Sequence, residues 1–221
     1  MNNGAGLGTL SGRPNVSLFI TFEGCEGCGK STQAKALSQK LAGLSTPVLL
    51  LHEPGGTELG DKVRYLLKWA KNLSISPMAE LLLFNSSRAN LVDQVIRPAL
   101  KQGDTVICDR FVDSTVAYQG YGRGIDLGLV VSACGMATQG LRPDLTILLD
   151  IPVEEGLMRK AAKAGLDRFE QTDSSFHRRV REGYLKMAQE QPARWLVIDG
   201  TRTRAEIRRT IWQRVEGLLD R

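Results

Sequence analysis

The sequence predicts an α/β fold of three layers, with a five-stranded parallel sheet between helices on both faces. Short apolar runs alternate along the chain with longer helical patterns, which is typical of a parallel sheet. The runs are hydrophobic almost without interruption, as expected for strands covered on both sides. The expected strands are 18–22, 48–51, 105–108, 145–149 and 195–198.

Helical patterns fill the intervals between these strands. One helix is expected at 32–42, directly after a glycine-rich loop. A second is expected at 78–101, because it follows Pro77 and proline is favoured in the first turn of a helix. Pro98 is expected to kink or end that second helix. Further helices are expected at 127–139, 154–164, 175–189 and 204–219.

Length and composition predict one domain. The 221 residues are 42% hydrophobic and 24% charged, which suits a single globular unit at 17–221 behind a flexible, Gly-rich tail at 1–16. The net charge of +5 fits a protein that handles polyanions, although the basic residues are dispersed. No run approaches the roughly 18 apolar residues of a membrane helix, and the first 15 residues lack the apolar core of a signal peptide, so a cytoplasmic location is expected.

A glycine-rich loop carries the strongest chemical signal. Residues 24–31 read GCEGCGKS, which matches G-x-x-x-x-G-K-S between a strand and a helix. In such a loop the backbone N–H groups and the helix N-terminus bind phosphates, Lys30 reaches the β- and γ-phosphates, and the Ser31 hydroxyl ligates Mg²⁺. The expected ATP-binding residues are Gly24, Glu26, Gly27, Cys28, Gly29, Lys30, Ser31 and Thr32.

Two of the four cysteines lie within this loop. Cys25 and Cys28 form a C-x-x-C, but no second cysteine or histidine pair follows them as a zinc site requires. We interpret both as small residues that fit variable positions of the loop. An effect of their oxidation on the loop is a separate hypothesis.

Polar residues also follow the other strands, where ligands of parallel sheets bind. Asp109 ends the third expected strand, at a position suited to hold Mg²⁺ or its waters, and Arg110 beside it is able to bind a phosphate through two parallel hydrogen bonds. A local ion pair or a helix cap is the alternative for these two residues.

Two further pairs have the four-residue spacing of one helix face. Phe84 and Arg88 could stack on a base and donate to it, although a phenylalanine in an apolar run is more often core. Arg159 and Lys163 begin a basic segment suited to close over a transferring phosphoryl group, and a solvated helix face is the alternative.

Together these motifs resemble the thymidylate kinase family from about residue 17 to the C-terminus. The matching stretches are FEGCEGCGKS at 22–31, EPGGT at 53–57, DRF at 109–111, STVAYQG at 114–120, RPD at 142–144 and DRFE at 167–170. The resemblance implies a fold like that of phosphate-loop nucleoside monophosphate kinases, with a small mobile lid at about 159–172. It also implies transfer of the γ-phosphoryl group of ATP to dTMP.

The resemblance further implies roles for individual residues. Glu53, a Pro54 that is often cis, Arg64 and Arg110 would surround the dTMP phosphate, and Phe84 would stack on thymine. Asp109 would position Mg²⁺, and Glu26 would face the junction of donor and acceptor. The other expected dTMP-binding residues are Arg88, Ser114, Thr115, Tyr118 and Gln119.

Position 27 distinguishes two branches of this family. One branch carries an arginine there, whereas this chain has Gly27 and so resembles the branch that supplies its catalytic cation from the lid. Lys163 is the main candidate, with Arg159 and Arg168 in support, although arginine is more common at the lid position. Catalysis is then expected from Lys30, Asp109, Arg110 and these lid cations.

Other functions remain open at this stage. A kinase acting on deoxynucleosides or CMP is the nearest alternative, a nucleotide-dependent switch is a less favoured one, and the basic pI of about 9.1 is the only feature that favours a nucleic-acid-dependent ATPase. No nucleic-acid or membrane partner is expected. The resemblance implies a homodimer, which helices at 63–69 and 81–101 have the apolar surface to form.

Overall fold

The computed structural model describes residues 16–70, 73–161, 169 and 172–220. Almost all of the expected N-terminal tail and most of the expected lid, with Lys163 and Arg168, lie outside these ranges.

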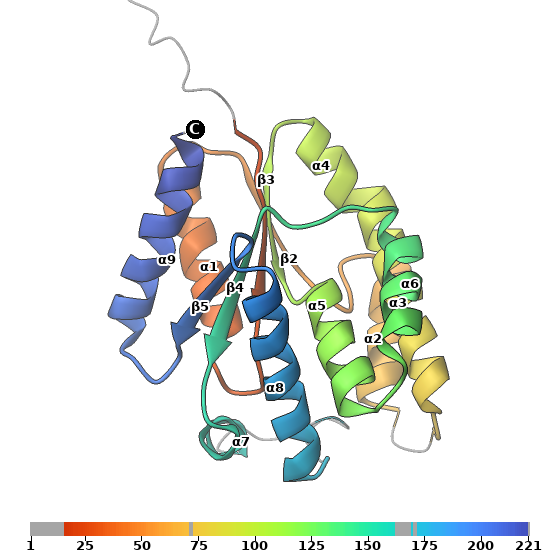
Figure 1. Cartoon of the computed structure of the whole chain (residues 1–221). Coiled ribbons are helices and arrows are strands. Elements are labelled where there is room, and N and C mark those ends of the chain that lie inside the picture. The colour runs from red at the N-terminus through yellow and green to blue at the C-terminus, as the bar shows by residue number, and fades with distance from the viewer. Residues whose placement is uncertain (1–15, 71–72, 162–168, 170–171, 221) are drawn as a thin grey trace, which may run out of the picture.

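A five-stranded parallel sheet forms the centre of the molecule and confirms the predicted fold class (Figure 1). Its order is β2-β3-β1-β4-β5, so the strand that leads into the glycine-rich loop is the middle one. The strands are β1 Phe19–Glu23, β2 Val48–His52, β3 Thr105–Asp109, β4 Leu145–Asp150 and β5 Trp195–Asp199. Each expected strand is present, and each observed strand extends one residue further at its carboxyl end.

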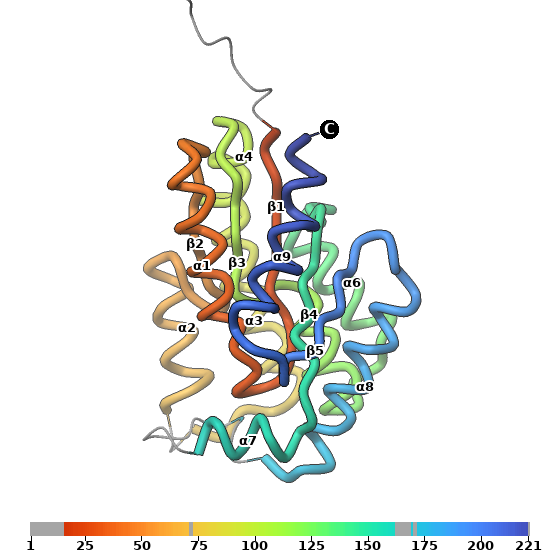
Figure 2. The backbone as a smooth tube through the Cα atoms, turned by 90° about the vertical axis from the view of Figure 1, so that its left-hand side faces the viewer, coloured from red at the N-terminus to blue at the C-terminus, as the bar shows by residue number. Residues whose placement is uncertain are grey.

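Two helices cover one face of the sheet. α1 (Lys30–Gly43) and α9 (Arg204–Leu219) lie side by side there (Figures 1 and 2). Because side chains alternate along a strand, Ile20 and Phe22 pack with these two helices, whereas Phe19 packs into the opposite layer. Lys40 of α1 also lies 3.8 Å from the ring centroid of Trp212 on α9.

The other face is covered by a larger helical layer. Regular helix from Pro77 gives way to a π-helical segment just before Pro98, where the prediction placed a kink or end, and helix continues to Lys101. The missing N–H of Pro98 accounts for this irregularity. This layer comprises α3 Pro77–Leu91, η1 Val92–Ile96, α4 Arg97–Lys101, α5 Val112–Thr115, η2 Val116–Gly122, α6 Leu127–Thr138 and α8 Ser174–Glu190, and α2 Glu58–Lys68 packs on α3.

One helical stretch was not predicted from the sequence. The residues 112–122 form α5 and η2, although Gly120 and Gly122 are poor helix formers. Packing against α8 stabilises this stretch, and Arg179 donates two hydrogen bonds, of 3.3 and 3.0 Å, to the Gly122 carbonyl at its end. A contact distant in sequence therefore overrides the local preference.

Candidate active site

A cavity of about 790 Å³ opens at the carboxyl ends of the strands. The glycine-rich loop forms its floor, and α7 (Val153–Ala161), which follows β4, lies at this end of the molecule (Figures 1 and 2). Most of the residues expected from sequence meet in this cavity: Glu26, Gly27, Cys28, Gly29, Lys30, Ser31, Thr32, Glu53, Pro54, Arg64, Phe84, Asp109, Arg110, Ser114, Thr115, Tyr118, Gln119 and Arg159. Gly24 and Arg88 do not line it.

The glycine-rich loop holds Lys30 and Ser31 in different ways. The Lys30 ammonium is buried and donates to the Gly24 and Cys25 carbonyls at 2.9 and 2.7 Å. The Ser31 hydroxyl donates to the carboxylate of Asp109 at the end of β3. Two oxygen ligands thus lie together at the start of α1, and this donor set fits Mg²⁺, a hard cation that prefers oxygen ligands.

Arg110 is enclosed by hydroxyl and carboxylate groups from three parts of the chain. Its guanidinium donates to the Ser114 and Tyr184 hydroxyls at 3.0 and 3.2 Å, to the Tyr118 hydroxyl at 3.2 Å and to Glu26 at 3.4 Å. Its backbone has a φ of 73°, which is uncommon for a residue with a side chain. The side chain is thus aimed at the cavity by many partners at once.

Glu26 connects this arginine to α8. The carboxylate accepts a hydrogen bond of 2.5 Å from Tyr118, and His177 of α8 lies 3.3 Å from its other oxygen. Burial by itself would raise the pKa of Glu26, but the neighbouring His177 and the charges of Arg110 and Lys30 outweigh it and hold the pKa below its ordinary value. Glu26 is therefore ionised beside the cavity at neutral pH.

Glu23 lies in a second layer behind Arg110. Its carboxylate accepts from the Phe111 N–H at 2.8 Å and from the Ser114 and Tyr184 hydroxyls at 2.6 and 2.9 Å. Complete burial, followed by the negative charge of Asp113, raises the pKa of Glu23 to about 7. The Ser114 and Tyr184 hydroxyls thus accept hydrogen bonds from Arg110 and donate hydrogen bonds to Glu23. Both their oxygen and their hydrogen are therefore held in place.

The expected acceptor side of the cavity contains a buried ion pair. Arg88 lies 2.8 Å from Glu53 and also donates to the Phe111 carbonyl and the Thr115 hydroxyl at 3.2 and 2.9 Å. Glu53 and Thr115 line the cavity, whereas Arg88 does not. The Glu53–Pro54 peptide bond is cis, as the resemblance implied, and Arg64 donates to the Pro54 carbonyl at 2.8 Å.

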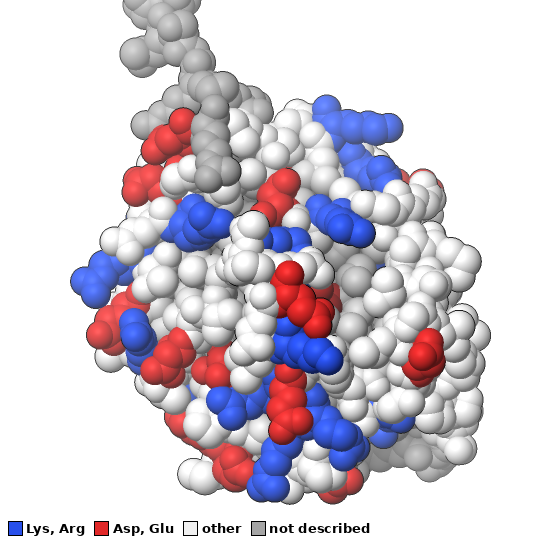
Figure 3. All heavy atoms as spheres, in the orientation of Figure 1, with Lys and Arg blue, Asp and Glu red and all other residues white. Residues whose placement is uncertain are grey.

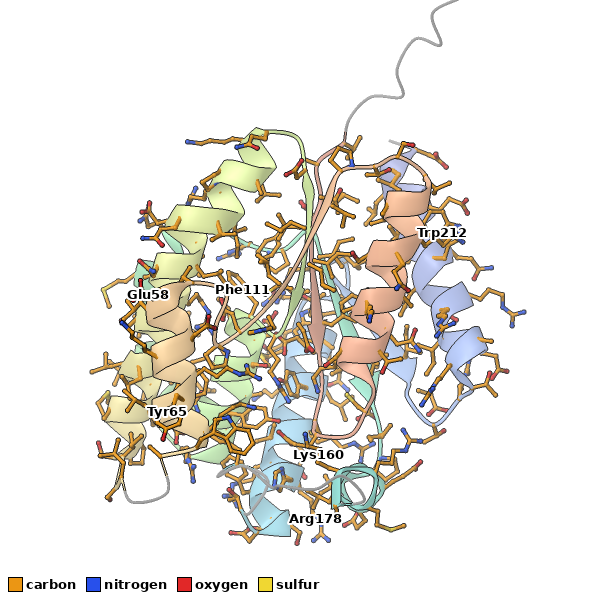
Figure 4. All side chains as sticks on the ribbon, turned by 180° about the vertical axis from the view of Figure 1, so that it is seen from behind. Glu58, Tyr65, Phe111, Lys160, Arg178 and Trp212 are labelled. Atoms are coloured by element: carbon orange, nitrogen blue, oxygen red, sulfur yellow. The ribbon has the colours of Figure 1, made fainter. Side chains whose placement is uncertain are left out.

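Helix α7 approaches the glycine-rich loop through two glycines. A Cβ atom on Gly27 would lie 2.1 Å from the Gly156 carbonyl oxygen, and one on Gly156 would lie 2.4 Å from the Glu26 carbonyl oxygen. Gly27 also has a φ of 71°. This contact brings Arg159 and Lys160, at the end of α7, to the cavity, and Figure 4 shows Lys160 at this end of the molecule.

Several lining residues were missed from sequence. One group follows β5 directly, so the rule that ligands bind at strand ends could have found it. Others, such as Lys160 and Phe169, fall within the expected lid but were not among the predicted site residues. The additional lining residues are Gln33, His52, Lys68, Lys160, Phe169, Gly200, Arg202, Thr203, Arg204 and Ile207.

The loop cysteines pack as small apolar residues. Cys25 belongs to the hydrophobic cluster around α8, whereas Cys28 belongs to the cluster beneath α1. Burial raises the pKa of the Cys25 thiol to about 12, which disfavours the reactive thiolate. Their packing supports the interpretation of both residues as fillers.

Among the described residues, no helix is long and apolar enough to cross a membrane.

Comparisons with known proteins point to one family. A sequence model described as thymidylate kinase matches residues 22–211. The thymidylate kinase of Dehalococcoides mccartyi is 53% identical over 204 residues, which cover 92% of this chain and 98% of that protein. The thymidylate kinase of Deinococcus radiodurans is 48% identical over 198 residues, covering 90% of this chain and 96% of that protein. The crystal structure of the Ehrlichia chaffeensis thymidylate kinase is similar with a TM-score of 0.74 and 35% identity, covering 90% of this chain and 99% of that one.

Proposed function

The chain belongs to the thymidylate kinase family and phosphorylates dTMP with ATP, and from that premise we propose how the cavity divides this work. The observation that carries the proposal is the position of Arg110, which lies between the phosphate-binding loop and the expected dTMP wall. An oxygen of the dTMP phosphate attacks the γ-phosphoryl group in line, giving dTDP and ADP. Because that oxygen is already ionised, positioning and charge compensation account for catalysis.

The donor site is assigned to the loop, with Lys30 and the start of α1 on the ATP phosphates. Ser31 and Asp109 would hold Mg²⁺, partly through water, and the ion would supply charge compensation for the phosphates. Four residues after β5 line the cavity on the α9 side and would border the nucleoside of ATP: Gly200, Arg202, Thr203 and Arg204. Removal of divalent cations should abolish turnover and added Mg²⁺ should restore it, and undiminished turnover in excess chelator would contradict this assignment.

The acceptor site is assigned to the opposite part of the cavity. Arg64, Arg110 and the Glu53–Pro54 turn would surround the dTMP phosphate, with Ser114 and Tyr118 orienting Arg110. Phe84 would stack on the base. Thr115 and Gln119 would contact the polar edge of the base, and Arg88 would support Thr115 from behind.

The catalytic cation is assigned to the lid. An arginine at position 27 would have to displace α7, because even a Cβ there would meet the Gly156 carbonyl oxygen at 2.1 Å. Arg159 and Lys160 are the described basic residues of the expected lid that line the cavity, and Lys163 and Arg168 lie in the segment outside the described ranges. Lys163→Ala should lower kcat on the order of 100-fold with little change in the KM for dTMP, whereas Lys35→Ala on the exposed side of α1 should not. Equal kcat values for the two variants would refute the assignment to Lys163.

The remaining expectations are carried forward as proposals. Residues 17–221 would form one domain, with a tail at 1–16 and a lid at about 159–172. Four free and buried cysteines are compatible with a reducing compartment such as the cytoplasm. The protein would act as a homodimer, since apolar side chains on α2, α3 and α6 are exposed.

A steady-state assay of ADP release tests the choice of acceptor. With ATP and Mg²⁺, dTMP should give the highest kcat/KM among dTMP, dUMP, CMP and thymidine. Release of ADP without an acceptor should be slow, because closure of the lid over both substrates excludes water. A higher kcat/KM with CMP or thymidine would favour the alternative kinase, and tight nucleotide binding without any transfer would favour a switch.

A further inference from the structure

The side-chain amide of Gln119 has a hydrogen-bond partner for its nitrogen but none, among the described residues, for its oxygen. Its Nε2 donates to Oε1 of Glu80 at 2.8 Å. Its Oε1 accepts no hydrogen bond from the part of the chain that the structure describes, although the side chain is almost completely buried and lines the cavity. Because Gln119 lines the cavity, we infer that this acceptor faces the space in which the base is expected.

Glu80 decides which half of the amide is open. Its own carboxylate is paired with Arg123, whose Nε lies 3.2 Å from Oε1 and whose Nη2 lies 3.3 Å from Oε2. A carboxylate in such a pair accepts hydrogen bonds and does not donate them. If the Gln119 amide were turned over, its oxygen would face a carboxylate oxygen, so the nitrogen is held toward Glu80 and the oxygen toward the cavity.

Thr115 is held by another ion pair, which leaves its hydroxyl as a donor where Gln119 offers an acceptor. Its Oγ1 accepts from Nη2 of Arg88 at 2.9 Å, and Arg88 is held by Glu53. A guanidinium has no acceptor, so the hydroxyl hydrogen of Thr115 must point away from Arg88. Thr115 lines the cavity, where its hydroxyl has a donor to offer.

We propose that Glu80 is a specificity-determining positioning residue, which selects thymine and uracil over cytosine by fixing the amide of Gln119. The inference rests on the proposed dTMP site. Thymine and uracil present an N3–H donor and an O4 acceptor, which complement the Gln119 acceptor and the Thr115 donor. Cytosine presents an N3 acceptor and an N4–H₂ donor, so both of its groups meet a group of the same kind.

Glu80→Gln tests this inference because a neutral amide at position 80 is able to donate or accept, which frees Gln119 to turn. The substrates are dUMP and dCMP, which differ only at the N3 and C4 positions of the base. The kcat/KM ratio of dUMP to dCMP should fall at least about tenfold in the variant, the effect expected when one buried hydrogen bond is no longer enforced. Glu58→Gln, on the exposed side of α2, is the matched control and should leave the ratio unchanged.

The single variant leaves the charge of Arg123 unpaired, which could prevent folding. The double variant Glu80→Gln/Arg123→Gln removes both charges of the pair and replaces the single variant in that case. It should lower the same ratio. The inference would be overturned by an equal loss of activity with both substrates, or by an unchanged kcat/KM ratio of dUMP to dCMP in a folded variant. Either result would mean that Glu80 has only a structural role. Failure of the unmodified enzyme to phosphorylate dTMP would instead overturn the proposed function.

Discussion

Arg110 shows at the scale of a single residue how this site is held in place. Its positive φ costs free energy for a residue with a Cβ, on the order of 1–3 kcal/mol. Hydrogen bonds from its guanidinium to three hydroxyls and a carboxylate offset that cost. Glu23 and Glu26 lie behind the hydroxyls and orient them.

Tyr184→Phe should weaken this arrangement without opening a cavity. The change removes one acceptor from Arg110 and one donor from Glu23, so kcat/KM for dTMP should fall about tenfold, the effect of one hydrogen bond to a charged group. Steady-state kinetics measures the change. Tyr121→Phe is the matched control, because the structure gives the Tyr121 hydroxyl no hydrogen bond to a described residue, and an equal loss in both variants would contradict the role of Tyr184.

Glu23 should make folding stability fall with rising pH. Its pKa is raised from 4.5 to about 7 in the folded state, so below pH 4.5 both states are protonated and the contribution is complete. As the pH rises to about 7, the unfolded chain loses its proton first, and the folded state loses this advantage. Above about pH 7 the contribution is gone.

Urea unfolding at pH 5 to 8 measures this slope. Glu23→Gln should remove a decline of more than about 1 kcal/mol in the free energy of unfolding over that interval. Glu58→Gln should keep the decline, since Glu58 is exposed. A Glu23→Gln protein with the slope of the unmodified chain would contradict the raised pKa.

At the scale of elements, the important contact is that between α7 and the glycine-rich loop. Gly27 and Gly156 allow the two backbones to approach, while Arg178 and Arg181 of α8 pair with Glu154 and Asp150 at 2.7 Å around the start of α7. In the proposed site, the position of the lid cations relative to ATP therefore depends on a backbone contact.

Gly156→Ala should separate these elements. Its Cβ would meet the Glu26 carbonyl oxygen at 2.4 Å, so α7 must move, and a displacement of about 1 Å is able to cost on the order of 100-fold in kcat. The thermal unfolding temperature should fall somewhat, because the clash with a backbone carbonyl outweighs the better helix propensity of alanine. Gly135→Ala on α6, where no atom lies within 4 Å of the added Cβ, is the control for kcat. Wild-type kcat in Gly156→Ala would show that the contact does not position the lid.

At the scale of the whole molecule, one edge is unusually apolar. The surface over α6 is almost free of charged residues in Figure 3, and Figure 4 shows Tyr65 of α2 on the outer side of the molecule. Exposed apolar side chains on α2, α3 and α6 include Leu59, Tyr65, Leu66, Met78, Leu82, Leu129, Val131 and Met136, and Trp69 directly follows α2. Such patches mark protein interfaces in soluble proteins.

Light scattering after size exclusion should give a mass near twice the chain mass of 24.3 kDa. Leu82→Glu, at a side chain that is 56% exposed on α3, should shift the protein to monomer, because a buried unpaired carboxylate opposes association. Leu44→Glu, beyond the end of α1, should leave the mass unchanged. A monomeric unmodified protein, or a Leu82→Glu dimer, would contradict this interface.

The sequence by itself determined the sheet, the loop and most of the site. Apolar runs of strand length and a glycine-rich loop are local signals, and the carboxyl ends of parallel strands meet at one edge, so Lys30, Asp109 and Arg110 could be placed together before any coordinates. The same rule also covers the lining residues after the fifth strand, Gly200, Arg202, Thr203 and Arg204, which the sequence predictions did not include.

Only the tertiary structure decided how these residues are supported. Tyr184, Glu80 and Gly156 act through neighbours more than 30 residues away in sequence, and nothing local in the sequence distinguishes them from ordinary helix residues. Arg88, expected at the base or its surroundings, donates to Thr115 without lining the cavity itself, a placement that the four-residue spacing from Phe84 does not indicate. The physical reason is that local pattern determines which element forms, whereas the direction of a side chain and the orientation of a hydrogen bond depend on what packs against it.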